Sequence, residues 1–390
     1  MRKLNQTELN KRLEELAEKG IADKLYSGIA GRVLQNGEPV TEILKGVADL
    51  DTKQPVTADT MFRLASMTKP VTASAVLAAQ DMGLLTVFDE VRKYLPAYGE
   101  MWVGRKVTHD DGSVEVVPAE KAKKQLRIHH LLSHVNGICS GELGNLQYDR
   151  MTNEDRSSLE NIVNWMGKHL CLDFQPDEVT GYSGVAAQDV AARIVEIVSG
   201  MPFDEFVQKT IFDPIGVKDI TFRPTDEQWS RMMCMFVNDG EHGPYMDRSL
   251  GRTTFECFPI TYFSGGASLT GTLNAYTKFA EMLRQEGTYD GVRVLSPAAV
   301  KLMQAPWPLP GTAGIGPVET WGLGVRTIRD GHPWLTSGTF GWSGAYGTHF
   351  WIDPENKVTA IMMRNSRIDG GAGAAATLRF EQAVNGSFEG

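Results

Sequence analysis

The chain is poor in cysteine and has no long run of apolar residues. Its four cysteines lie far apart in 390 residues and form no C-x-x-C pair: Cys139, Cys171, Cys234 and Cys257. Such spacing in a chain of this size favours buried thiols over a disulfide framework. No apolar stretch approaches the length that crosses a bilayer, so we expect no membrane contact. The residues behind Met1 lack the apolar core of a secretory signal, which predicts a cytoplasmic protein.

The chain also lacks an excess of positive charge. Its 39 Lys and Arg residues are outnumbered by 48 Asp and Glu, which gives a formal net charge of −9. A nucleic-acid-binding protein normally carries a basic face, so we expect no nucleic-acid partner. The share of hydrophobic residues, 42%, is ordinary for a globular protein. The length allows more than one core-forming unit, or one large domain with insertions.

Hydrophobic periodicity predicts strands near both ends of the chain and helices between them. Strands are expected over 26–34 and 40–47, around the Asn36-Gly37 turn, and over 321–328, 347–352 and 358–363. Helices are expected over 7–19, 66–82, 126–132, 157–166, 184–198, 203–212, 274–286, 297–304 and 373–384. Residues 231–261 show little periodicity and are predicted to form irregular loops or a hairpin.

This order predicts an α/β sandwich. An antiparallel sheet would be built from both chain ends and flanked by helices, with an inserted, mostly helical region. We expect residues 1–98 and 261–390 to form the two parts of the sheet-containing domain, and 99–260 to form the helical region, all within one unit. The polar stretch 99–125, with a turn at Asp110-Asp111-Gly112, is predicted to be a surface insertion.

The stretch Phe62 to Ala73 carries the strongest chemical signal. Ser66 and Lys69 form the only S-x-x-K pair in the chain, directly before a long apolar segment. If Ser66 opens a helix, Lys69 follows on the same face one turn later. An amine held that close can take the proton of a serine nucleophile. The helix start also provides free N–H groups and a partial positive charge, which favour developing negative charge.

Two further motifs are each open to two interpretations. Tyr182 precedes the helix at 184–198 and could act as a base with Lys69, although the tetrapeptide alone favours a buried tyrosine with a satisfied hydroxyl. The glycine-rich stretch from Gly341 to Gly347 could supply an oxyanion N–H or be a plain turn. The stretch around Ser343 departs from G-x-S-x-G only at its last position. A nucleophile elbow needs a helix after the serine, but a strand is expected there, so we exclude Ser343 as the nucleophile.

No metal site is expected. His130 and His134 are four residues apart, but Leu131 occupies the position where a zinc peptidase has its glutamate, and no third ligand is evident. Helix packing or capping is the better interpretation of both histidines.

Taken together, the motifs resemble those of the serine β-lactamase-related hydrolases. Ser66-Met67-Thr68-Lys69, Tyr182-Ser183-Gly184 and Trp342-Ser343-Gly344 resemble the three ordered motifs of that family. Residues 130–138, 211–217 and 265–267 are similar to further family segments, so the resemblance covers roughly residues 25 to 385.

The resemblance implies a role for each of these residues. Ser66 would be the acylated nucleophile, and Lys69 and Tyr182 together the base. The N–H groups of Ser66 and Ala345 would hold the oxyanion, and no cofactor is implied. The resemblance reverses the preference at Tyr182, which we now expect to be catalytic.

Two departures from the family pattern bear on the substrate. Gly184 replaces the asparagine of Tyr-x-Asn, and Trp342 replaces the lysine that holds a substrate carboxylate in β-lactamases. Trp-x-Gly is instead typical of family VIII carboxylesterases, which the insertion carrying Trp102 also resembles. We therefore expect Trp342, Gly344 and Trp102 to contact the substrate.

These features predict a carboxylesterase that acts on short-chain or small aromatic esters, with water or another alcohol as acyl acceptor. The alternatives are a β-lactamase, DD-peptidase or D-amino-acid amidase of the same fold, and a catalytically silent relative that binds a ligand.

Overall fold

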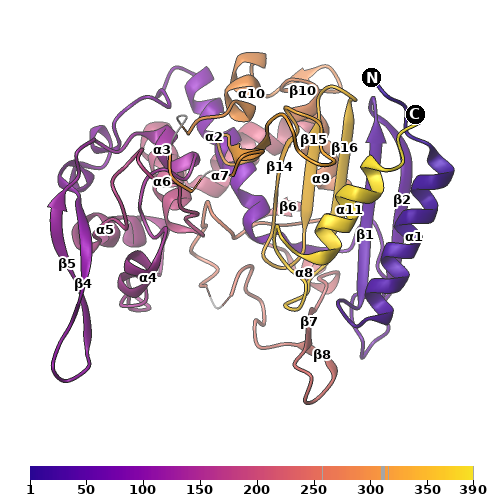
Figure 1. The fold of residues 1–390 in the computed structure, drawn as a ribbon, viewed down its shortest axis with the longest axis horizontal. Coiled ribbons are helices and arrows are strands. Elements are labelled where there is room, and N and C mark those ends of the chain that lie inside the picture. Colours follow the sequence, from indigo (N-terminus) through magenta and orange to yellow (C-terminus); the bar gives the residue numbers. More distant parts are fainter. Residues whose placement is uncertain (257, 309–311, 315, 390) are drawn as a thin grey trace.

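A seven-stranded antiparallel sheet joins the two ends of the chain in the computed structural model (Figure 1), which describes residues 1–389 except 257, 309–311 and 315. Its strands, in spatial order, are β12 (Glu319–Trp321), β13 (Arg326–Ile328), β14 (Phe340–Ser343), β15 (His349–Asp353), β16 (Val358–Met363), β1 (Gly28–Gln35) and β2 (Glu38–Gly46). Strand β1 pairs with β16, with Ala30 opposite Met363. The prediction of a sheet built from both termini is therefore confirmed.

Helices cover both faces of this sheet. The terminal helices α1 (Gln6–Ala22) and α11 (Ala375–Asn385) lie together on one face (Figure 1). The predicted apolar stripe of α1 is buried there, with Leu9 and Leu13 in one core with Val33 and Phe380. The opposite face packs against α2 (Thr68–Asp81), α9 (Leu273–Arg284) and α10 (Pro297–Gln304) in a larger core.

The middle of the chain forms a mostly helical region beside the sheet, as expected. Its helices are α3 (Ile128–Leu132), α4 (Glu142–Tyr148), α5 (Leu159–His169), α6 (Ala186–Ser199), α7 (Phe203–Val207) and α8 (Asp226–Ser230). A π-helical turn, Gln208–Phe212, extends α7. A small sheet of β3 (Phe62–Arg63), β9 (Thr270–Gly271) and β6 (Ile220–Thr221) lies at the junction.

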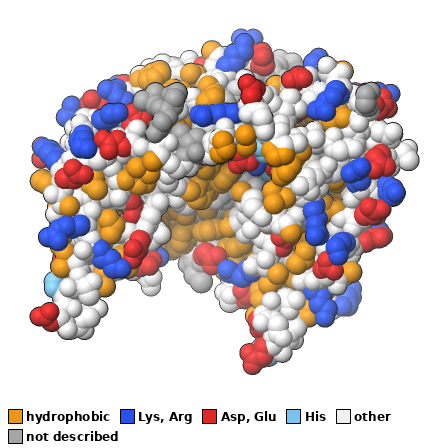
Figure 2. All heavy atoms as spheres, in the orientation of Figure 1, with side chains coloured by type: hydrophobic (Ala, Val, Ile, Leu, Met, Phe, Trp, Pro, Cys, Tyr) orange, Lys and Arg blue, Asp and Glu red, His pale blue; other side chains and the backbone are white. Residues whose placement is uncertain are grey.

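Two hairpins extend from this body. The predicted insertion at 99–125 is the hairpin β4 (Trp102–Thr108) and β5 (Val114–Lys121), with Gly112 at positive φ in its turn. The poorly periodic segment contains the hairpin β7 (Met235–Asn238) and β8 (Pro244–Asp247). Figure 2 shows a hollow between these two projections, with hydrophobic side chains gathered on its floor.

One predicted strand is wrong. Within this range Trp321 ends strand β12 and residues 326–328 form β13. A tight turn joins these antiparallel strands, and in it the Gly322 N–H donates to the Val325 carbonyl oxygen at 2.8 Å. Gly324 has a φ of +71° and packs so closely on α2 that an added Cβ would lie 2.8 Å from the Lys69 carbonyl oxygen. The apolar residues Leu323 and Val325, which suggested a strand, are therefore buried in a turn. Strand β14 was not predicted, because its glycines suggested a loop.

No helix in the described part of the chain combines the length and apolar character that crossing a membrane requires.

Candidate active site

Ser66 lies in a 3₁₀ turn, Ala65–Met67, that leads from strand β3 into helix α2. The preceding residue, Ala65, is fully buried and has a φ of +45°, a conformation that is unfavourable for a residue with a Cβ. Ser66 itself is 8% exposed. As one of the first residues of the turn, its N–H has no acceptor within the described residues. The local fold thus presents both the hydroxyl and the N–H of Ser66.

Lys69 is fully buried in the first turn of α2 and points at Ser66. Its Nζ lies 3.1 Å from Ser66 Oγ and donates to the carbonyl oxygens of Gly184 at 2.6 Å and Gly266 at 2.9 Å. These three partners match the three N–H bonds of an ammonium group. If Lys69 loses a proton, the two carbonyls retain the remaining N–H bonds and a lone pair faces the Ser66 hydroxyl. The arrangement suits a base that takes the serine proton.

Tyr182 completes a cluster of three polar side chains. It lies on the loop before α6, and its Oη is 2.8 Å from Ser66 Oγ. The Lys69 Nζ is 4.9 Å from the centre of its ring. The Tyr182 side is the open side of the cluster, because this residue is 38% exposed. The structure therefore brings Ser66, Lys69 and Tyr182 together.

Aromatic rings surround the Tyr182 hydroxyl. Trp342, on β14, donates from Nε1 to Tyr182 Oη at 3.1 Å. The Trp321 ring lies 5.7 Å from the Tyr182 ring, nearly parallel to it, and 4.6 Å from the Trp342 ring.

His134 packs against Tyr182, with 4.7 Å between the ring centres, and accepts from the Ser183 N–H at 3.2 Å. Burial and the nearby Lys69 charge hold the pKa of His134 well below its usual value, so its imidazole is neutral.

Sequence reasoning did not place Trp321 or His134 in the site. Trp321 had no motif around it, and the hairpin that brings it to Tyr182 was predicted as one strand. His134 lies in the segment that resembled the family, but it was interpreted only as a packing or capping residue. His130, its supposed partner in a metal pair, instead accepts from the Arg127 N–H at 3.1 Å, at the start of α3.

Gly344 and Ala345 bring the end of β14 against the residues that precede Ser66. A Cβ at Gly344 would lie 2.2 Å from the Leu64 carbonyl oxygen and 2.2 Å from Thr348 Oγ1, so only glycine fits. Thr348 Oγ1 donates to the same Leu64 carbonyl at 2.9 Å. Ala345 is exposed, and no residue in the described ranges accepts from its N–H. A second free N–H therefore lies on the segment that packs against Leu64.

Two further residues singled out from the sequence are Gly184, at the asparagine position of Tyr-x-Asn, and Trp102, which was predicted to contact the substrate. Gly184 borders open space, with nothing within 4 Å of an added Cβ. Trp102 begins β4 and is 40% exposed. Among the described residues, no hydrogen bond or ring contact joins Trp102 to the Ser66 cluster.

Ser343 belongs to a serine–histidine–carboxylate chain that is distinct from the Ser66 cluster. Its Oγ lies 2.8 Å from His349 Nδ1, and His349 Nε2 lies 3.2 Å from Glu381 Oε1 on α11. Exposure is only 4% for Ser343, 1% for His349 and nil for Glu381. Burial to this degree keeps Ser343 from a substrate, and Glu381 is also paired with Arg326. This chain ties β14 and β15 to α11.

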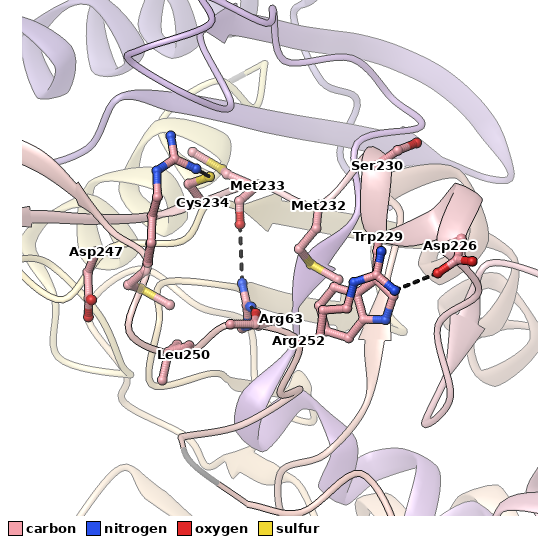
Figure 3. Close-up of a pocket in the computed structure, with 13 residues that line it drawn as sticks. Arg63, Asp226, Trp229, Ser230, Met232, Met233, Cys234, Asp247, Leu250 and Arg252 are labelled. Carbon is pink, nitrogen blue, oxygen red and sulfur yellow. Dashed lines mark hydrogen bonds and ion pairs between the residues drawn. The ribbon is translucent and has the colours of Figure 1, made fainter.

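A separate cavity of about 300 Å³ lies beside β3, near Arg63 (Figure 3). The buried Arg63 guanidinium donates to the carbonyl oxygens of Thr253, Met233 and Gly251. The other two guanidiniums of the cavity wall are neutralised: Arg248 pairs with Asp49 and Asp51, and Arg252 pairs with Asp226. Because its cations are already engaged, we interpret this cavity as part of the framework that holds β3.

Comparison with known proteins assigns the chain to a family. The chain matches the Beta-lactamase family model over residues 13–384. Esterase EstB of Burkholderia gladioli is 26% identical over 414 residues, covering 98% of this chain and 96% of the esterase. Two of the solved structures that share the fold are named for their activities. EstCE1, a hydrolase with promiscuous acyltransferase activity, has a TM-score of 0.74 and 22% identity over 97% of this chain and 99% of its own. A family VIII carboxylesterase has a TM-score of 0.73 and 19% identity over 96% of each chain.

These matches extend over nearly the whole chain. The predicted resemblance and the predicted fold are both confirmed. The protein belongs to the Beta-lactamase family.

Proposed function

We propose that the protein is a serine carboxylesterase that works through an acyl-enzyme on Ser66. The observation that carries this proposal is the double contact of one hydroxyl. Ser66 Oγ lies 3.1 Å from Lys69 Nζ and 2.8 Å from Tyr182 Oη. A serine flanked by an amine and a phenol has both a proton acceptor and a route for returning the proton.

The reaction follows from these positions. Lys69, coupled to Tyr182, takes the Ser66 proton as Oγ attacks the ester carbonyl. The N–H groups of Ser66 and Ala345 stabilise the negative oxygen of the tetrahedral intermediate. Tyr182 returns the proton to the leaving alcohol, and the acyl group stays on Ser66. Water or a second alcohol, activated by the same pair, then releases the acyl group.

Neutral esters are favoured over β-lactams and peptides by the groups around Tyr182. A substrate carboxylate would need a cation near β14, but Trp342 offers an indole there, and its N–H is engaged by Tyr182 Oη. Lys69, the amine beside Ser66, is buried and engaged. The relatives EstB and EstCE1 are named as an esterase and a hydrolase with acyltransferase activity, which supports an ester substrate and leaves the acyl acceptor open to alcohols.

A substrate panel with a matched pair of serine variants tests the proposal. The panel is nitrophenyl acetate, butyrate and benzoate, a chromogenic cephalosporin, and a D-alanine anilide. We expect kcat/KM to be highest for the esters, to vanish in Ser66→Ala and to persist in Ser343→Ala. Turnover that survives in Ser66→Ala, or efficient amide or lactam turnover beside negligible ester turnover, would contradict the proposal. No turnover of any substrate by the wild type would favour a silent binding protein.

A further inference from the structure

Asp189 is a fully buried carboxylate that the proposed reaction does not use. It lies on α6, seven residues after Tyr182, and has no exposed surface. Its oxygens accept from the hydroxyls of Tyr262 and Ser264, the latter at 2.7 Å. Burying a charge so completely is costly unless it is paired or hydrogen-bonded. Its partners show what this carboxylate holds.

The partners of Asp189 lead directly to Lys69. The Ser264 hydroxyl also accepts from the Gly266 N–H at 3.1 Å, and the Gly266 carbonyl accepts from Lys69 Nζ at 2.9 Å. The neighbouring Gly265 carbonyl accepts from the Thr72 hydroxyl of α2 at 2.7 Å. Residues 264–266 are thus bonded to α6 on one side and to α2 on the other.

The glycines make this segment sensitive to its support. At Gly265, an added Cβ would lie 2.7 Å from the Gln188 carbonyl oxygen. At Gly266, it would lie 2.6 Å from the Val185 Cα. The segment therefore rests on the backbone of α6 with no side chain of its own in between. The position of the Gly266 carbonyl, one of two that orient the Lys69 amine, depends on the Asp189 contacts.

Asp189 acts on Lys69 through these hydrogen bonds and not through an ion pair. Across the described residues, no carboxylate forms an ion pair with Lys69 Nζ, whose three acceptors are uncharged oxygens. Burial raises the pKa of Asp189 to about 7, and the hydrogen bonds from Tyr262, Ser264 and Gly266 and the Lys69 charge oppose that rise. These hydrogen bonds therefore favour the ionised form of the carboxylate that accepts them.

The other titratable groups that act on Asp189 are neutral near pH 7. Burial raises the pKa of Tyr98, Cys139, Tyr148 and Tyr262 above their usual values.

We propose that Asp189 is the positioning residue of the catalytic lysine: it fixes the 264–266 segment that orients the Lys69 amine. The inference rests on the proposed role of Lys69 as the base for Ser66. Asp189 touches neither the substrate nor the reacting atoms.

Asp189→Asn tests the proposal, with Glu381→Gln as the matched control because it also converts a fully buried carboxylate to an amide. Both variants are checked for folding by circular dichroism and thermal unfolding, then assayed on nitrophenyl acetate from pH 5 to 9. For Asp189→Asn we expect kcat to fall roughly 10- to 100-fold with little change in KM, since a misplaced amine loses alignment with Ser66.

Glu381→Gln should lose stability and keep both kcat and KM. Ser264→Ala removes one link but keeps the carboxylate, so its kcat should fall by less than that of Asp189→Asn. A folded Asp189→Asn enzyme with wild-type kcat would overturn the inference while leaving the esterase proposal intact. An inactive wild type would instead refute the proposed function on which it rests.

Discussion

The contact between Gly344 and Leu64 gives a sharp test of the oxyanion site. In Gly344→Ala, the new Cβ would lie 2.2 Å from both the Leu64 carbonyl oxygen and Thr348 Oγ1. Carbon atoms in that position are essentially never closer than 3.0 Å to a neighbour, so each contact must lengthen by at least 0.8 Å. The movement separates the Ala345 N–H from the Ser66 N–H, because Gly344 adjoins Ala345 and Leu64 lies two residues before Ser66.

The expected cost follows from the loss of one oxyanion donor. Such a loss lowers kcat roughly 100- to 1,000-fold, and overpacking costs about 1–3 kcal/mol of stability. The assay is steady-state hydrolysis of nitrophenyl acetate by Gly344→Ala, with its fold checked by thermal unfolding. Gly184→Ala is the control on the other side of the site, where an added Cβ meets nothing within 4 Å, and should stay within a few-fold of wild type. A folded Gly344→Ala enzyme with unchanged kcat would refute the assignment of the Ala345 N–H.

Three further predictions concern the site and its support. Tyr182→Phe removes the hydroxyl that lies 2.8 Å from Ser66 Oγ and should lower kcat roughly 100- to 10,000-fold at similar KM in the ester assay. Trp342→Phe removes the Nε1–H donated to Tyr182 Oη, and the loss of about 1 kcal/mol should lower kcat roughly fivefold. Burial alone would raise the pKa of Glu381, but its interactions with His349 and Arg326 outweigh burial and lower that pKa from 4.5 to about 2. The ionised carboxylate therefore contributes about 3 kcal/mol to the free energy of unfolding above pH 4.5, and this contribution is lost as the pH falls toward 2. Denaturant unfolding of Glu381→Gln and wild type should therefore differ much more at pH 6 than at pH 2.5.

Each of these outcomes has a contrary result. Near-normal kcat in Tyr182→Phe would leave Lys69 as the sole base for Ser66. An unchanged kcat in Trp342→Phe would reduce the indole to a wall of the site. A stability difference for Glu381→Gln that is independent of pH would mean that Glu381 is not held ionised by its partners.

The parts of the fold that carry strong local patterns were predictable from the sequence. The stripe of Leu9, Leu13 and Leu16, the Asn36-Gly37 turn and the strand over 358–363 are local signals, and the structure has all three elements. The 321–328 segment failed because its turn is buried against α2, and burial gives a turn the apolar character of a strand. Strand β14 failed for the opposite reason, since close backbone packing demands glycines that resemble a loop.

The candidate site divides in the same way. The spacing of Ser66 and Lys69 on one helix is local, so their contact could be expected from the sequence. Tyr182 lies 116 residues after Ser66, and only the resemblance to a family connected them. Trp321 and Asp189 reach the site through a hairpin turn and a chain of hydrogen bonds, neither of which leaves a local pattern.

The most direct test of the central claim is a mass measurement on the acylated protein. The enzyme is mixed with excess nitrophenyl butyrate, quenched in acid within milliseconds, and analysed intact and after proteolysis. The account predicts a mass increase of one butyryl group, located on the peptide that contains Ser66 and absent from Ser66→Ala. An acyl group on another residue, or rapid ester hydrolysis that proceeds in Ser66→Ala as in the wild type, would contradict it.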